Sequence, residues 1–182
     1  MKHLICVVAC LFLFVSGTFA AKFESTILKT DSATGQFYYE KVVETNNTSK
    51  EALYKAVKTW VVAHIKTVDN NIAFDDAGFG TIVTTPTISI SDVGNVVKHQ
   101  AANFKLTIFF KDNKFKISAT DFTYYGIDMQ NAEYTGPLEK VAIKRILPNP
   151  TKKVAEHFDD AFSAFINQLS KASAPDQAKN DW

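Results

Sequence analysis

Arginine and cysteine are almost missing from this 182-residue chain, and each shortage excludes a class of function. Arg145 is the one arginine, although guanidinium groups supply most bidentate contacts to phosphates and guanines in nucleic-acid complexes. The two cysteines, Cys6 and Cys10, lie within the first ten residues. The remainder of the chain therefore has no disulfide, no thiol nucleophile and no cysteine ligand for a metal. We expect no nucleic-acid partner.

Long apolar stretches are also missing after residue 20, so the sequence predicts no membrane span. Residues 1–20 combine a basic start, an apolar run from Leu4 to Val15 and small residues before Ala20. This pattern is typical of a cleavable signal peptide, because its apolar run is too short to cross a bilayer. We expect cleavage near Ala20 and a secreted or periplasmic protein, with lipid attachment at Cys10 as the alternative.

The remaining composition indicates one globular domain. Lys2 is the only charged residue of the leader, so residues 21–182 carry 19 basic and 19 acidic side chains. This neutrality argues against a polyanion as partner, and an apolar content of 46% argues against disorder. We predict a signal peptide over 1–20, an N-terminal loop over 21–35, a single α+β domain over 36–171 and a disordered tail over 172–182.

Two amphipathic helices and several short strands are predicted inside this domain. Aromatic and β-branched residues indicate a strand over 36–44, and short strands are predicted over 72–74, 80–85 and 87–91. The first helix should cover 49–67, with Thr48 and Glu51 as a capping box. Its apolar stripe comprises Leu53, Ala56, Val57, Trp60, Val61, His64 and Ile65, with Tyr54 on the other side. The second helix begins near Thr151 and buries Val154, Phe158, Ala161, Phe162, Phe165, Ile166 and Leu169, with Asp159 outside the stripe.

The clearest local pattern is a β-hairpin over residues 103–122. Apolar and polar residues alternate on both sides of Asp112-Asn113, and both of these residues tolerate the positive φ of a two-residue turn. This turn pairs Phe110 with Phe115, Ile108 with Ile117 and Leu106 with Ala119. Every pair falls on one face of the hairpin, so the turn and the pattern predict the same register.

The predicted order of elements is β-α-β-β-β-β-α, which is an α+β fold. A single antiparallel sheet with both long helices packed on one face satisfies it, because each helix has one apolar stripe and each strand one apolar face. Residues 138–147 are expected to form a short helix before the second long one. Tyr124-Tyr125-Gly126 is expected to leave the last strand.

Three segments of the chain resemble a known family. They are Ser49-Lys50-Glu51-Ala52-Leu53-Tyr54, Lys58-Thr59-Trp60 and the turn Lys111-Asp112-Asn113-Lys114-Phe115, followed by Thr120-Asp121-Phe122. Together they resemble the secreted bacterial domain of unknown function 4468, over residues 38–124. The resemblance implies a curved sheet of the TATA-binding-protein-like fold, backed by helices and preceded by a signal peptide. It implies no activity and no functional residues, and a fold name shared with a DNA-binding protein is analogy alone.

Residue patterns that carry catalysis or bind metals are scarce. His64, His99 and His157 lie on different predicted elements without the spacing of a metal site, so we expect no metal and no cofactor. Asp75 and Asp76 are expected to form a turn rather than an acid/base pair. Asp121 is placed by its alternation near the core end of a strand, where a turn-bonding role is favoured over catalysis. An enzyme is therefore the less favoured interpretation.

Lysines on the polar side of the hairpin form the candidate binding site. The predicted register places Lys105, Lys111, Lys114 and Lys116 on the face away from the core, with Phe109 as an apolar anchor. This face is either a solvated surface or a platform for an acidic or hydroxyl-rich ligand. We favour a non-enzymatic binding or assembly domain of the bacterial cell envelope, with a protein or polymer as partner. An envelope hydrolase with a dispersed site and a self-associating subunit are the alternatives.

Overall fold

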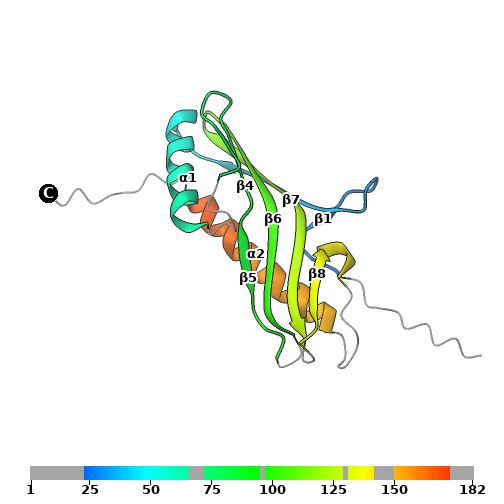
Figure 1. Cartoon of the computed structure of the whole chain (residues 1–182). Coiled ribbons are helices and arrows are strands. Elements are labelled where there is room, and N and C mark those ends of the chain that lie inside the picture. Colours follow the sequence, from blue (N-terminus) through cyan, green and yellow to red (C-terminus); the bar gives the residue numbers. More distant parts are fainter. Residues whose placement is uncertain (1–22, 66–71, 95–96, 129–130, 142–149, 173–182) are drawn as a thin grey trace, which may run out of the picture.

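The computed structural model describes residues 23–65, 72–94, 97–128, 131–141 and 150–172 (Figure 1). Eight strands form one antiparallel sheet in the order β1-β2-β7-β6-β4-β3, with β5 on β6 and β8 on β7. The strands are β1 (Lys29–Thr30), β2 (Phe37–Glu44), β3 (Phe74–Asp76), β4 (Thr81–Thr84), β5 (Thr87–Ile90), β6 (Val97–Lys111), β7 (Lys114–Asp128) and β8 (Glu133–Pro137). The helices are α1 (Lys50–His64), the 3-10 turn η1 (Leu138–Lys140) and α2 (Pro150–Lys171).

The long hairpin of β6 and β7 is the centre of the sheet. Phe110 pairs with Phe115, Ile108 with Ile117 and Leu106 with Ala119, which confirms the register predicted from the sequence. Each long strand carries two short strands along its outer edge. β2 and β8 follow one another along β7, and β4 and β5 follow one another along β6, with Pro86 between the last two.

Both long strands extend beyond the predicted hairpin, and each contains one β-bulge. The register shifts once between Lys98 and Ala101 and once between Asn103 and Lys105. His99 and Asp121 have positive φ angles of 52° and 56° beside these shifts. An extra residue in a strand reverses which side chains face the core. Asp121 is therefore exposed rather than at the core end of the strand, which corrects its predicted position.

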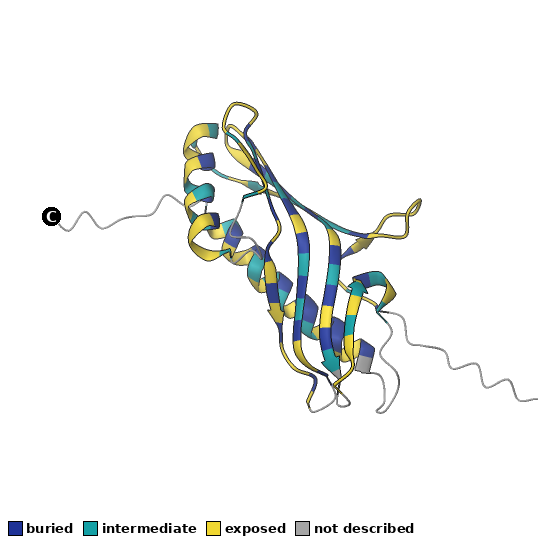
Figure 2. Ribbon diagram, in the orientation of Figure 1, coloured by how far each residue is buried: buried dark blue, intermediate teal, exposed yellow. Residues whose placement is uncertain are grey.

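The two helices lie on one face of the curved sheet, and the strands present their other face to the viewer (Figure 1). Figure 2 shows buried and exposed residues alternating along the two central strands. The buried side supplies Phe104 and Phe122, which form edge-to-face ring contacts with Phe162 of α2. The prediction of an α+β fold with two helices on a large antiparallel sheet is confirmed, although six strands rather than four separate the long helices.

Helix α1 differs from its prediction at both ends. Its N-cap is Ser49 rather than Thr48, because the Ser49 hydroxyl accepts a hydrogen bond from the Ala52 amide. Tyr54 is buried instead of solvated, and its ring contacts Phe110. His64 was expected in the core but is exposed, stacked on the half-buried Trp60.

The hairpin turn holds the start of α1 in place. The Asp112 carboxylate accepts a hydrogen bond of 2.9 Å from the Lys50 amide, and the Asn113 side-chain oxygen accepts one of 3.0 Å from the Thr48 amide. Asn113 itself adopts the expected positive φ, at 63°. The turn and the first helix therefore form one connected unit.

The segment before β1 packs on α2 rather than lying loose. Phe23 is fully buried and contacts the rings of Phe37 and Phe158. Asp159 accepts hydrogen bonds from the Ser25 hydroxyl and from both the amide and the hydroxyl of Thr26, at 2.5–2.7 Å. Asp159 is accordingly 8% exposed, which corrects its expected place outside the buried stripe.

Residues 123–128 and 131–141 extend the sheet sideways and do not cover its free face. Tyr124-Tyr125-Gly126 continues β7 instead of leaving the strand, and β8 pairs with it. The helix expected over 138–147 appears as η1 at 138–140. Residues 142–149 lie outside the described residues, as do the predicted signal peptide over 1–20 and most of the predicted tail. Within the described ranges, no helix is both long and apolar enough to span a membrane.

Candidate functional site

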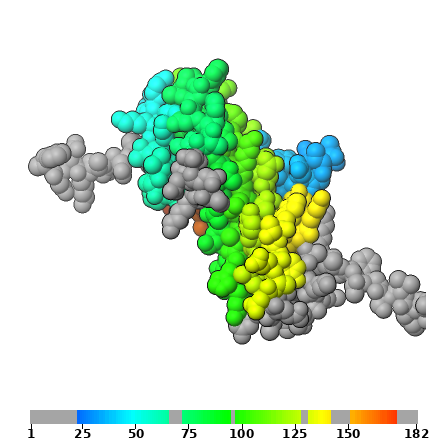
Figure 3. Space-filling view, viewed as in Figure 1, coloured from blue at the N-terminus to red at the C-terminus, as the bar shows by residue number. Residues whose placement is uncertain are grey.

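The five residues singled out as a candidate site lie on the sheet face opposite the helices. Alternation along β6 directs Lys105, Phe109 and Lys111 to this face, and alternation along β7 does the same for Lys114 and Lys116. Lys116 is half-buried and the other four are exposed. In Figure 3 the strands, rather than α2, form most of the surface that faces the viewer.

Four of the five residues share one shallow groove. Phe109, Lys111, Lys114 and Lys116 line a cavity of about 420 Å³, and Val42 of β2 completes it. Lys105 does not line this cavity and lies nearer the bulge, opposite Thr120. We call the cavity the lysine groove, and its lining residues are Val42, Phe109, Lys111, Lys114, Phe115 and Lys116.

Two parallel rows of side chains run across the strands in the lysine groove. The first row is cationic, because Lys111 and Lys114 stand directly opposite each other at the end of the hairpin. The second row runs from Val42 through Lys116 to Phe109. It is largely apolar, because apolar side chains stand on both sides of the Lys116 stem. Val42 and Phe109 are 54% and 44% exposed, which is unusual for large apolar side chains in the middle of a sheet.

The lysines of the groove differ in their partners. The Lys116 ammonium forms an ion pair of 2.6 Å with Glu40 of β2, so its aliphatic stem lies between Val42 and Phe109. Lys111 and Lys114 make no ion pair with any described residue, although Glu44 stands opposite Lys114 in the β2 register. The first row therefore holds two lysines and one carboxylate, and its net positive charge is not taken up by an ion pair with any described residue.

Val42 is the groove residue that sequence reasoning did not identify. Its strand was predicted correctly, but the pairing of β2 with β7 joins residues 70 or more positions apart. A signal was present: Val42 and Val43 are adjacent apolar residues in an alternating strand, so one of the two must face away from the core.

A second group of ionisable residues lies between α1 and β3. Asp75 accepts a hydrogen bond from the Tyr54 hydroxyl and forms an ion pair with Lys58. Tyr54 and Lys58 also line a groove of about 530 Å³ on the outer side of α1. The turn expected around Asp75-Asp76 begins one residue later, where the Asp76 carboxylate accepts a hydrogen bond from the Phe79 amide.

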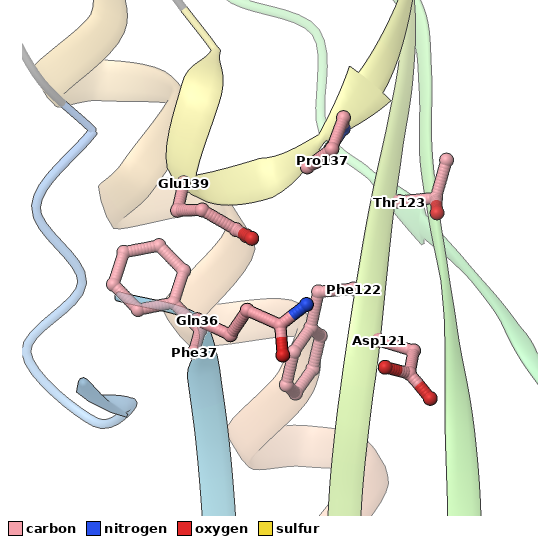
Figure 4. Close-up of a pocket in the computed structure, with 7 residues that line it drawn as sticks. All are labelled: Gln36, Phe37, Asp121, Phe122, Thr123, Pro137 and Glu139. Atoms are coloured by element: carbon pink, nitrogen blue, oxygen red, sulfur yellow. The ribbon is translucent and has the colours of Figure 1, made fainter. Parts of the chain in front are cut away.

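A third cavity, of about 190 Å³, opens beside β7 between the segment that pairs with β2 and the segment that pairs with β8 (Figure 4). Gln36, Asp121 and Glu139 are its polar side chains. The two carboxylates lie on opposite sides of β7 in Figure 4, so they do not form a proton-sharing pair. The bulge at Asp121 directs that carboxylate away from the cavity centre.

The fold does not bring together the three histidines that follow residue 20. The His157 Nδ1 donates a hydrogen bond to the Ser91 carbonyl, and the His99 amide donates one to the Asp92 carboxylate. No cluster of three or more metal-ligating side chains occurs in the part of the chain that the structure describes.

Comparisons with known proteins agree with this fold. Residues 39–125 match the family model described as Domain of unknown function (DUF4468) with TBP-like fold. The crystal structure of a TBP-like protein from Parabacteroides distasonis superposes with a TM-score of 0.64 at 18% identity, over 79% of this chain and 96% of that one.

A second crystal structure, of a DUF4468 family protein from Bacteroides ovatus, gives a TM-score of 0.54 at 16% identity, over 81% of this chain and 92% of that one. A search of the curated proteins finds no match. The resemblance predicted from the sequence is therefore confirmed: residues 39–125 match the model of the domain of unknown function 4468 family, and the two solved structures share the TBP-like fold of this chain.

Proposed function

We propose that this protein is a non-enzymatic binding domain of the bacterial cell envelope, which holds an anionic partner in the lysine groove. The observation that carries the proposal is the groove itself, where two lysines without ion-pair partners among the described residues adjoin two exposed apolar side chains. Exposed apolar area rimmed by charge is typical of recognition surfaces. A signal peptide cleaved near Ala20 would deliver the domain to the periplasm or the outside of the cell.

Rigid support of the groove favours recognition over a merely solvated face. The groove lies beside the hairpin turn, whose Asp112 and Asn113 side chains are hydrogen-bonded to the start of α1. Beneath it, Phe110 and Phe115 are buried and stack on each other. Side chains on such an anchored surface lose little further freedom when a partner binds.

The test is binding of a fluorescently labelled acidic peptide, followed by fluorescence polarisation. We expect binding that weakens as salt rises, because exposed charges are screened. The double variant K111E/K114E should abolish binding, whereas K29E/K153E, which reverses two exposed lysines on β1 and α2, should not. Equal binding by both variants, or no salt dependence, would contradict the proposal.

The envelope hydrolase remains the second candidate because of the group around Asp75. Tyr54, Lys58 and Asp75 place three ionisable groups in contact beside a groove, which is the arrangement expected of an acid/base site. Hydrolysis of envelope esters or glycosides by the wild type, lost in Y54F and D75N but kept in K111E/K114E, would favour it. Sedimentation of the wild type tests the third alternative, which is self-association through the free face, because it measures the mass of the species in solution.

A further inference from the structure

We infer that the lysine groove binds a small amphiphilic carboxylate, which is an acid group joined to an aryl or short alkyl group. The inference rests on the proposed function and narrows its ligand. The acid group would lie between Lys111 and Lys114, and the apolar group would cover Val42 and Phe109.

One cross-strand pair beside the hairpin turn consists of two like charges. Lys111 and Lys114 are directly opposite in the hairpin, an arrangement that destabilises a sheet by mutual repulsion. Residues that break a local rule in this way are commonly found at functional sites. An anionic group between the two ammonium groups removes the repulsion and gains two charge-assisted hydrogen bonds.

The distance between the cationic row and the apolar row matches the length of a small molecule. Lys111 and Phe109 are two residues apart on β6, which separates the cationic and apolar rows by about 7 Å. About five or six bonds of an extended carbon chain span that distance, so one small molecule reaches both rows. A cavity of about 420 Å³ is of the size that encloses such a ligand.

The surroundings of the groove select against a long polyanion. Glu40 and Glu44 of β2 flank it on one side, and Asp76 of β3 lies on the same face at the other edge. A polymer with many negative charges would meet these carboxylates wherever it left the groove. Because Glu40 also binds the Lys116 ammonium, the stem of Lys116 adds apolar surface between Val42 and Phe109 rather than a third free charge.

Titration of ¹⁵N-labelled protein with 4-phenylbutanoate, followed by NMR, tests the inference. We expect amide shifts confined to residues 41–43 and 109–116. The neutral 4-phenylbutanol, which lacks the acid group, and acetate, which lacks the apolar group, should each bind about tenfold or more weakly, a loss of about 1.4 kcal/mol. Equal affinity for 4-phenylbutanol and 4-phenylbutanoate would overturn the inference, and so would shifts scattered over the whole protein.

Matched variants assign the two parts of the ligand. F109S and K111Q/K114Q should each weaken 4-phenylbutanoate binding by about tenfold. The controls F79S and K153Q, which change an exposed phenylalanine and an exposed lysine outside the groove, should leave it unchanged. All five positions are exposed, and thermal unfolding of each variant verifies that it is folded. Loss of binding in the controls as well would overturn the assignment to the groove.

Failure of this inference can be told apart from failure of the proposed function. Salt-sensitive binding of the acidic peptide, lost in K111E/K114E, together with no binding of 4-phenylbutanoate, overturns the small carboxylate and leaves the proposed function standing. Binding of neither probe overturns both.

Discussion

Two buried polar side chains carry much of the specificity of this core. Asp159 of α2 is surrounded by donors from Ser25 and Thr26, and the Tyr124 hydroxyl of β7 donates a hydrogen bond of 2.9 Å to Gln100. A buried polar group costs free energy unless it is hydrogen-bonded, so each of these residues requires its partners in one position. Polar residues of this kind fix how elements dock, whereas apolar packing alone tolerates several arrangements.

Replacing Asp159 tests the docking of the N-terminal segment. The Asp159→Ala variant leaves the hydroxyl and amide donors of Ser25 and Thr26 without their acceptor, and should lower the free energy of unfolding by about 1–3 kcal/mol. The control is Asp160→Ala, because Asp160 is exposed on the same helix and should change stability by less than about 0.5 kcal/mol. Urea denaturation measures both, and equal effects would contradict the assigned role.

Tyr124 predicts a loss of stability at alkaline pH. Burial raises the pKa of Tyr124 above its ordinary value of 10, with further contributions from Asp92 and Tyr134. Above pH 10 the unfolded chain has therefore released a proton that the folded protein still holds. The unfolded state then binds fewer protons, so the free energy of unfolding falls as pH rises.

Denaturation between pH 9 and 11 measures this slope. We expect the slope to be shallower in Tyr124→Phe, which has no phenolic proton, whatever its effect at neutral pH. Tyr125→Phe is the control, because Tyr125 points to the exposed face of the same strand. A slope unaltered in Tyr124→Phe would show that other groups cause the alkaline loss.

At the scale of elements, the half of the central hairpin next to the Asp112-Asn113 turn was predictable, and the half beyond the pair of Leu106 and Ala119 was not. Alternation and the Asp112-Asn113 turn predict the pairing of Leu106 with Ala119 and every pair above it, because local sequence determines them. Beyond that point His99 and Asp121 introduce bulges, and the pattern of apolar residues changes its phase. A change of phase in a sequence looks like the end of a strand.

The same limit explains the candidate site. Its lysines and Phe109 share one local hairpin, so period-two alternation was enough to place them on one face. Val42 and the ion pair between Lys116 and Glu40 depend on β2 pairing with β7, a contact that no local pattern specifies. The neighbours of the groove were therefore visible only in the folded sheet.

The hairpin turn offers a prediction at the element scale. Asn113 has a φ of 63° and its side chain binds the Thr48 amide, so Asn113→Ala should lose both a suitable conformation and a hydrogen bond. Asn113→Gly keeps the conformation and loses only the bond. We expect the alanine variant to be the less stable by about 1 kcal/mol, the cost of a left-handed conformation. Urea midpoints compare the two, and equal stability would show that the turn relaxes.

At the scale of the molecule, the sheet is divided between two tasks. One face binds the helices and the N-terminal segment through aromatic residues such as Phe104, Phe158 and Phe162. The other face is crossed by lysines, carboxylates and a few exposed apolar side chains. Because the covered face supplies the core, residues on the free face can change with little effect on folding, which makes it the part of the molecule available for recognition.

The N-terminal segment extends the core beyond the domain predicted at 36–171. Phe23 is 1% exposed between Phe37 and Phe158, and Leu28 is 8% exposed. Cleavage near Ala20 would leave this segment intact at the start of the mature chain. A chain that begins at Ala21 should therefore be more stable than one that begins at Lys29.

We expect the shorter chain to lose at least the roughly 3–5 kcal/mol that removal of one buried phenylalanine costs. Phe23→Ala in the chain that begins at Ala21 should reproduce most of that loss, because its ring is the largest buried group of the segment. Glu24→Ala is the control, since Glu24 is exposed beside it and contributes no buried surface. Urea unfolding of the four chains decides the matter. If the chain from Lys29 were as stable as the chain from Ala21, the segment would lie on the core without stabilising it, and the domain would begin at β1.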